Sequence, residues 1–273
     1  MANTEVAPFG FPDFAPTLLA KYGPALRLAD AHSHLVNEMV AALPNEMKVE
    51  QAVIYGLVRM ATTSWVELLI LVGNGAGLGA LKIARGMFET SVVAEYLRQF
   101  PAEIEDYFEY FHIMSFKRIE TYRQHAAGLG VPPPEDVPKE RLEKIENDFH
   151  RVKSRFQDGK GRIRSQWNKH PISYMAEKIG RKNQYEMTYS LAASIHHGSF
   201  EALMAHLSGD GSAFDVDSPP SLEWIDQALL DGHVYLLQAL DTLNDLLKLG
   251  FDERLCLAGE DFQKVWRTPP VKE

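Results

Sequence analysis

Arg85 and Glu89 are the first pair in this sequence whose types and spacing suit chemistry. They lie four positions apart in a segment that is otherwise largely apolar, so a helix would place both on one face. A charge pair on a helix that packs into a core needs polar partners or a cavity. We predict that Arg85 binds an anion and that Glu89 orients the ligand or acts as a base. The alternative is an ordinary salt bridge within one helix.

Tyr189 and His197 form a second set. Tyr185, Tyr189, Ala193 and His197 follow one another at intervals of four, which puts them along one side of a helix. A histidine beside a tyrosine can be a general base, a metal ligand or a hydrogen-bonded core residue. We predict catalytic roles for Glu89, Tyr189 and His197, and the alternative for the last two is a place in the core.

Residues 151–182 form a basic block with ten lysines and arginines and only two acidic side chains. Such a block can bind a phosphate backbone, or it can pair with acidic helices of the same chain or of a second subunit. Within it, Arg164 and His170 match the loose Arg-x(4–6)-His pattern of the HEPN ribonucleases, which are small all-α proteins. In those proteins the pair lies on a helix, whereas the glycines and the proline around this pair predict a loop.

Two histidine motifs are similar to metal sites. His32 and His34 form a His-x-His element, but its flanks predict a helix, on which residues two apart point about 200° apart. Glu109 and His112 form an E-x-x-H element of the kind used in di-iron bundles. A complete site of that kind needs a second such element, and no other histidine here has a glutamate three positions before it. We therefore predict no metal at these motifs and no cofactor, while the ten histidines leave other metal sites open.

Most of the chain shows the apolar period of α-helices, and no run alternates with period two over the length of a strand. We predict an all-α fold, a single-domain helical bundle of about eight helices over residues 1–273. The expected helices cover residues 24–43, 46–72, 78–99, 101–128, 139–157, 173–179, 184–207 and 222–249.

Residues 68–84 hold an apolar run followed by a glycine-rich segment, which is typical of the first βα unit of a dinucleotide-binding fold. That fold needs further strands, whereas the chain after residue 84 stays helical. We therefore predict a tight turn between two antiparallel helices, with Gly73 or Asn74 as a left-handed C-cap.

The composition narrows the function classes. The net charge of -9 argues against a dedicated nucleic-acid binder, although the basic block keeps nucleic acid open as a partner. The single cysteine, Cys256, excludes an intramolecular disulfide and a cysteine-based zinc site. Residues 1–14 do not have the pattern of a signal peptide, and the most apolar window is interrupted by charges and glycines. We expect a cytoplasmic protein without a membrane span, and a homodimer because apolar residues near 224–247 are left over.

Several of these motifs together resemble a bacterial all-helical family that is catalogued only as a domain of unknown function. The resemblance covers about residues 50–210 and rests on the elements Arg85-x-x-x-Glu89, Tyr96-Leu97, Pro101, the Trp167 loop and Tyr189…His197-Gly198-Ser199. It implies a helical fold with Arg85, Glu89, Tyr189 and His197 as matched positions. The chain departs from the family pattern at Ala193, where the resemblance leads us to expect serine. The family brings no established activity.

These observations lead to one preferred function and two alternatives. We expect a polar pocket inside the bundle, lined by Arg85, Glu89, Tyr189 and His197, with Trp167 and His170 from the intervening loop as substrate-binding residues. The ligand would be small and anionic or polar, and a hydrolase-like activity is one outcome of such a set. The alternatives are a HEPN-like ribonuclease or nucleic-acid-binding effector that uses the basic block, and a non-catalytic interaction or sensor module.

Overall fold

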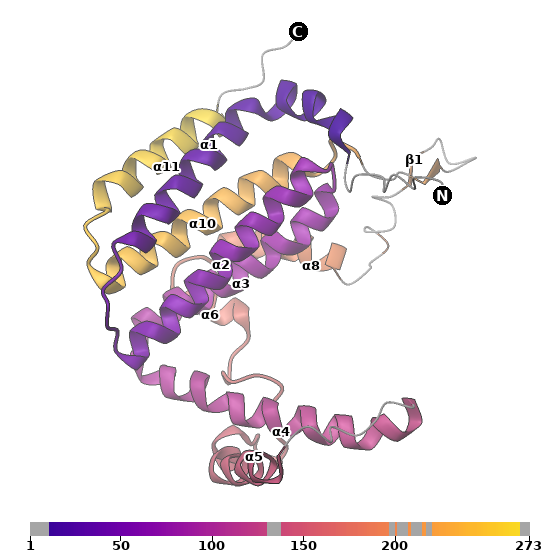
Figure 1. Cartoon of the computed structure of the whole chain (residues 1–273), viewed down its shortest axis with the longest axis vertical. Coiled ribbons are helices and arrows are strands. Elements are labelled where there is room, and N and C mark those ends of the chain that lie inside the picture. The colour runs from indigo at the N-terminus through magenta and orange to yellow at the C-terminus, as the bar shows by residue number, and fades with distance from the viewer. Residues whose placement is uncertain are drawn as a thin grey trace, which may run out of the picture. The chain divides into compact units, whose positions relative to one another are not determined.

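The computed structural model describes residues 11–129, 138–196, 200, 207–208, 215–216 and 220–267, and Figure 1 shows how the helices are arranged. The described part is built almost entirely of helices, which confirms the all-α prediction. It divides into two compact units. Unit 1 holds the described residues up to Gln99 and from Ile172 onward, and unit 2 holds Phe100–Pro171. The prediction that residues 1–273 form one domain stays a prediction.

Unit 1 contains the long helices that carry most of the predicted site. Its elements are η1 (Pro12–Phe14), α1 (Ala15–Ala41), α2 (Val49–Gly73), α3 (Gly77–Gln99), α6 (Ile172–Lys178), α7 (Lys182–Gln184), the π-helix η4 (Tyr185–Tyr189), α8 (Ser190–His196), α10 (Ile225–Leu247) and α11 (Asp252–Arg267). A short antiparallel pair, β1 (Leu207–Ser208) and β2 (Asp215–Val216), completes the described part of the unit, with Leu207 opposite Val216.

The core of unit 1 lies where α2, α3 and α10 pack against one another. Trp65 and Leu68 of α2 and Phe88 of α3 are fully buried there. α1 and α11 lie side by side and both pack against α10, as the indigo and yellow ribbons of Figure 1 show. α6 and α8 pack against α3. α3 is therefore covered from several sides, so its polar residues must find partners within the unit.

Unit 2 is a smaller pair of helices with its own core. It contains η2 (Pro101–Glu103), α4 (Ile104–Leu129), α5 (Lys139–Val152) and η3 (Lys153–Phe156). Tyr110, Ile113, Val152 and Phe156 are buried together between α4 and the end of α5. The chain then turns back through residues 157–171, which contain no helix.

Two helix starts differ from the prediction. α1 begins at Ala15 and continues through Pro24, which we had taken as its first residue. Proline removes only one helical hydrogen bond, and the apolar residues before it already bury one face of the helix. α2 begins at Val49 rather than near residue 46, because the side chain of Gln51 accepts a hydrogen bond of 3.0 Å from the backbone N–H of Lys48.

The structure also contains a helix that was not predicted, and it buries a surface that was predicted to be exposed. α11 (Asp252–Arg267) follows the helix that we had taken as the last, although Asp252 and Glu253 suit the N-terminal end of a helix dipole. The apolar residues near 224–247, from which we expected a dimer, are mostly buried as the core face of α10.

The glycine-rich turn is present as predicted, but its left-handed residue is a different one. α2 ends at Gly73 and α3 begins at Gly77, so the segment joins two helices and no strand enters it. The positive φ of 66° falls on Gly75, not on Gly73 or Asn74. The close approach of a later segment to this turn explains the glycines, since the backbone N–H of Ser221 donates to the carbonyl of Gly75 over 3.1 Å.

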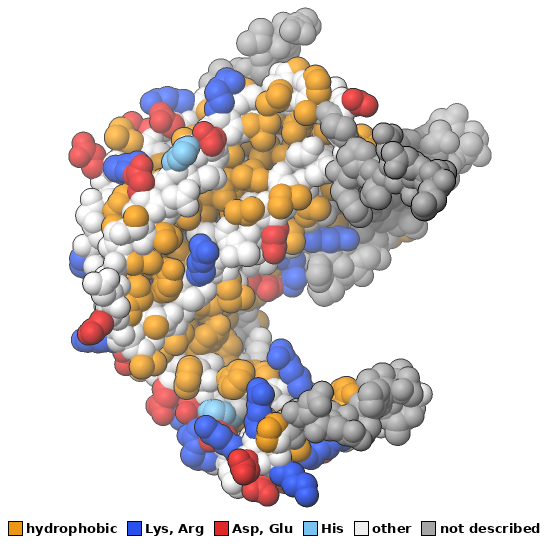
Figure 2. All heavy atoms as spheres, viewed as in Figure 1, with side chains coloured by type: hydrophobic (Ala, Val, Ile, Leu, Met, Phe, Trp, Pro, Cys, Tyr) orange, Lys and Arg blue, Asp and Glu red, His pale blue; other side chains and the backbone are white. Residues whose placement is uncertain are grey.

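α2 exposes part of its apolar surface. Met60, Val66 and Ile70 are each more than half exposed, and Figure 2 shows hydrophobic side chains between scattered charges on this view of the molecule. By length and composition α2 is the one described helix that is apolar enough to cross a membrane. α2 is also a core helix that packs on α3 and α10.

Candidate functional site

Arg85, Glu89 and Tyr189 contact one another in a closed triangle within unit 1. Arg85 and Glu89 lie one turn apart on α3, with Nη2 2.8 Å from Oε1. Tyr189 is the last residue of the π-helix η4, and its hydroxyl accepts a hydrogen bond of 3.0 Å from Nη2 of Arg85. The same hydroxyl donates to Oε1 of Glu89 over 2.7 Å. The structure thus brings together three of the predicted site residues.

The triangle is partly enclosed, and its surroundings keep the phenol of Tyr189 protonated. Tyr189 is buried, and the Arg85 guanidinium lies 5.1 Å from the centre of its ring. Burial, with the carboxylate of Glu89 beside it, raises the pKa of Tyr189 to about 12, so the phenol stays protonated at neutral pH. Glu89 keeps over a third of its side chain exposed, and its Oε2 has no hydrogen-bond partner among the described residues. That oxygen is open to a further hydrogen-bond partner.

The π-helix changes the geometry that we predicted for this segment. Hydrogen bonds from residue i to i+5 widen the turn at Tyr185–Tyr189, so the regular α-helical stepping by four does not hold there. The rings of Tyr185 and Tyr189 stack at 4.9 Å. Single π turns inside helices are rare and occur frequently at functional sites. The π turn therefore marks this segment independently of the residues that it carries.

Arg181 is a buried arginine of unit 1 that belongs, by sequence, to the basic block. It has 8% of its surface exposed. Its Nη1 donates to the hydroxyl of Ser91 over 3.0 Å, and its Nε donates to the side-chain oxygen of Gln184 over 2.8 Å. Burial lowers the pKa of Arg181 to about 10, which still leaves the side chain charged at neutral pH. No local pattern identified this residue, because its burial depends on segments far away in the chain.

Phe88 connects Arg181 with the triangle. The guanidinium of Arg181 lies 5.0 Å from the centre of the Phe88 ring, and the Tyr189 ring lies 5.2 Å from the same centre. Tyr235 of α10 packs on Phe88 at 5.2 Å, and burial raises its pKa, so this phenol is also protonated at neutral pH. The two arginines thus belong to one aromatic cluster, made by α3, the π-helix and α10.

Trp167 and His170 belong to the other compact unit. Trp167 is half-buried against the core of unit 2, with its ring 5.2 Å from that of Tyr107. His170 is exposed, and its backbone N–H donates to the side chain of Asn168 over 2.8 Å. Their predicted role in substrate binding stays a prediction. The predicted catalytic residue His197, with Gly198 and Ser199, lies outside the described residues.

Much of the basic block is paired within the chain. Its partners are carboxylates of α4 and of the block itself. The pairs are Arg151 with Glu109 at 2.8 Å, Arg155 with Glu105 at 3.0 Å and also with Asp106, Arg162 with Asp158 at 2.9 Å, and Lys182 with Glu177 at 3.7 Å. Arg164 lies 5.4 Å from the centre of the Phe156 ring and donates to the backbone oxygen of Arg155. Arg164 and His170 lie in the segment without helix, as the loop prediction required.

The two histidine motifs have other partners. Glu109 pairs with Arg151, and His112 lies 3.5 Å from Asp148. His32 is buried against His233, while His34 is exposed near Asp30. Within the residues that the structure describes, no three His, Cys, Asp or Glu side chains gather in a way that could hold a metal ion.

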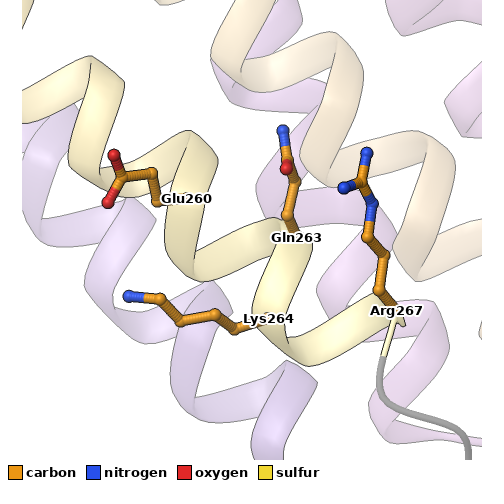
Figure 3. A pocket seen from close by; sticks show the side chains of 4 residues that line it. All are labelled: Glu260, Gln263, Lys264 and Arg267. Carbon is orange, nitrogen blue, oxygen red and sulfur yellow. The ribbon is translucent and has the colours of Figure 1, made fainter.

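A hollow on the surface of α11 is separate from this cluster. It has a volume of 410 Å³ and is lined by four side chains of the helix, which Figure 3 shows: Glu260, Gln263, Lys264 and Arg267. It is open to solvent and contains none of the predicted site residues. We assign no function to it.

Comparison with known proteins identifies the family of the chain. A model of a family of unknown function, DUF5677, matches residues 51–214. The chain belongs to this family. The match covers α2 from residue 51, α3, all of unit 2 and the π-helix, and so includes every predicted site residue. No curated protein and no solved structure matches the chain. Membership in DUF5677 confirms the resemblance seen in the sequence and brings no activity with it.

Proposed function

We propose that the aromatic cluster of unit 1 is a binding site for a small polar or anionic molecule, and that the protein carries out a hydrolase-like reaction there. The observation that carries this proposal is the triangle of Arg85, Glu89 and Tyr189. Three polar groups share one set of contacts beside a buried aromatic core, and one carboxylate oxygen remains open. Titratable groups that contact one another in this way cluster at sites of binding and proton transfer.

The roles follow from the contacts. Arg85 and Tyr189 both hold Oε1 of Glu89, which fixes the carboxylate and leaves Oε2 to take a proton from an attacking water. Tyr189 remains protonated, so it acts as a hydrogen-bond donor and not as a base. Arg85 supplies the positive charge that an anionic group or a developing oxyanion needs.

The test is hydrolysis of p-nitrophenyl acetate and p-nitrophenyl phosphate by the purified full chain. We expect Glu89→Gln, which keeps the size of the side chain, to reduce kcat/KM at least about 100-fold because it removes the base. We expect Tyr189→Phe to reduce it less, since the base remains. Circular dichroism and melting temperature should show that both variants stay folded.

Glu186→Gln is the matched control, because Glu186 lies in the same π-helix and is exposed. It should leave the rate unchanged. A wild-type protein that hydrolyses neither ester contradicts the hydrolase proposal. If Glu89→Gln and Tyr189→Phe then also lower the melting temperature strongly, the triangle is a structural network of a non-catalytic module.

We also propose a homodimer, now through α2 rather than α10. The support is the exposed apolar surface of Val66 and Ile70, which lie one turn apart on α2, with Met60 also exposed on this helix; a second copy would cover this surface. Light scattering should give a dimer mass for the wild type and a monomer mass for Ile70→Glu. A control at another exposed apolar site, Leu257→Glu on α11, should stay dimeric. A monomeric wild type at micromolar concentration contradicts this proposal.

A further inference from the structure

Arg181 is a buried charge that forms no ion pair with a carboxylate among the described residues, although the charge of Glu95, one turn beyond Ser91 on α3, acts on it from a distance. Its hydrogen-bond partners are neutral, a serine hydroxyl and a glutamine oxygen, and it lies over the rings of Phe88 and Tyr235. Its Nη2 is buried and has no hydrogen-bond partner in the described part of the chain. Burial of a charge costs free energy that cation–π contacts and neutral hydrogen bonds offset only in part. A negative group beside Nη2 would give this nitrogen a hydrogen-bond partner and would offset the buried charge.

The geometry of the guanidinium shows where that group fits. Nε and Nη2 lie on one edge of the planar fork, and this edge matches the two oxygens of a carboxylate. In Arg181 the Nε half of the edge donates to the neutral oxygen of Gln184, and the Nη2 half has no hydrogen-bond partner among the described residues. Nη1, on the other edge, is taken by Ser91. Gln184 is only half-buried, so its side chain can move away and leave the whole edge to a ligand.

We propose that Arg181 recognises the carboxylate group of a small organic ligand, which replaces the Gln184 side chain at the Nε and Nη2 edge. The site offers one positive charge and one two-pronged edge, which suits a single carboxylate. A phosphate dianion carries more charge and more acceptor oxygens than this edge can satisfy, and the aromatic surroundings offer few other donors. The ligand class is therefore a monocarboxylate with a compact apolar remainder.

This inference deepens the proposed function and rests on it, because Phe88 joins Arg181 to the Arg85–Glu89–Tyr189 triangle. Phe88 and Ser91 come from the same helix as Arg85 and Glu89, and Gln184 immediately precedes the π-helix. A carboxylate held at Arg181 would place the rest of the ligand beside this aromatic cluster. Arg181 is then the group that selects the ligand, while Glu89 acts on it.

The experiment follows the Nε–H resonance of Arg181 by NMR in the full-length protein, during titration with sodium acetate and sodium benzoate. Sodium phosphate and sodium chloride at the same ionic strength are the comparison arms. We expect a saturable shift with the carboxylates and a weaker response to phosphate. Gln184→Glu, which is close to isosteric, places a carboxylate of the chain itself on the free edge. It should raise the melting temperature and weaken the apparent affinity for acetate at least about tenfold.

Gln263→Glu, an exposed position on α11, is the matched control and should bind acetate like the wild type. The proposal is overturned if neither carboxylate shifts the resonance, if chloride or phosphate shifts it as strongly, or if Gln184→Glu responds like the wild type. Hydrolysis that depends on Glu89, without a response of Arg181, leaves the proposed function and removes this inference. A response of Arg181 without hydrolysis supports carboxylate binding at Arg181 and contradicts the hydrolase-like reaction.

Discussion

Replacing Gly77 by alanine is expected to destabilise the protein by about 3 kcal/mol, the upper part of the range for overpacked sites. A Cβ at this position would lie 2.0 Å from the carbonyl oxygen of Glu223 and 3.0 Å from the backbone of Trp224 and Ile225. These are backbone atoms at the start of α10, so no flexible side chain can move aside. The start of α3 and the start of α10 would have to separate. Urea denaturation of the wild type and the variant measures the effect.

Gly79→Ala is the control for this prediction, because it changes the same kind of residue in the same turn of α3. Its Cβ would meet Leu71 at 3.6 Å, an ordinary van der Waals contact. Because alanine favours the helix over glycine, Gly79→Ala should stabilise the protein by up to about 1 kcal/mol. Equal destabilisation by both changes, or none by Gly77→Ala, would show that α3 and α10 do not approach closely here.

Acid is expected to destabilise the protein through a buried pair of histidines. His32 of α1 and His233 of α10 lie with their Nδ1 atoms 3.0 Å apart, beside Trp65. Burial lowers the pKa of His32 to about 4 and that of His233 to about 3, from an ordinary value of 6.5. Below pH 6.5 the unfolded chain therefore holds more protons at these residues than the folded chain. The free energy of unfolding then falls by about 1.4 kcal/mol per pH unit for each such proton.

Asp231 acts in the opposite direction within the same range. Burial raises its pKa to about 6, so the folded state takes up a proton there as the pH falls, and this offsets one of the two histidine protons. The test compares the pH dependence of unfolding between pH 6.5 and 5 for the wild type and for His233→Gln. The variant should lose about 1.4 kcal/mol less per pH unit, because one buried histidine no longer titrates.

His34→Gln is the matched control for the histidine pair. His34 lies on the same helix as His32, but it is exposed near Asp30. Its removal should leave the pH dependence close to that of the wild type. If His233→Gln and the wild type show the same slope, the buried pair does not control the acid stability of the fold.

Helical periodicity is a local property, and it predicted most elements correctly. α3 and α6 follow the predicted ranges within one residue, and the turn at Gly73–Gly77 follows from the glycines themselves. The same local rule placed Arg85 and Glu89 on one face of a helix, where their ion pair now lies. It failed at Pro24, where the buried face of α1 outweighs one missing hydrogen bond. It also failed at α11, which begins two residues after Gly250, a residue type that is common at helix ends.

The rest of the site was decided by contacts between distant segments. Arg181 reaches Ser91 across 90 positions, and His233 reaches His32 across 201, so neither burial could be seen in a local pattern. The π turn at Tyr185–Tyr189 has no signature in a period of 3.6 residues. The sequence by itself determined which residues form helices and which face of each helix is apolar, because both depend on neighbours three or four positions away. Only the tertiary structure decided which polar side chains meet inside the bundle, because burial and charge pairing depend on how those helices pack.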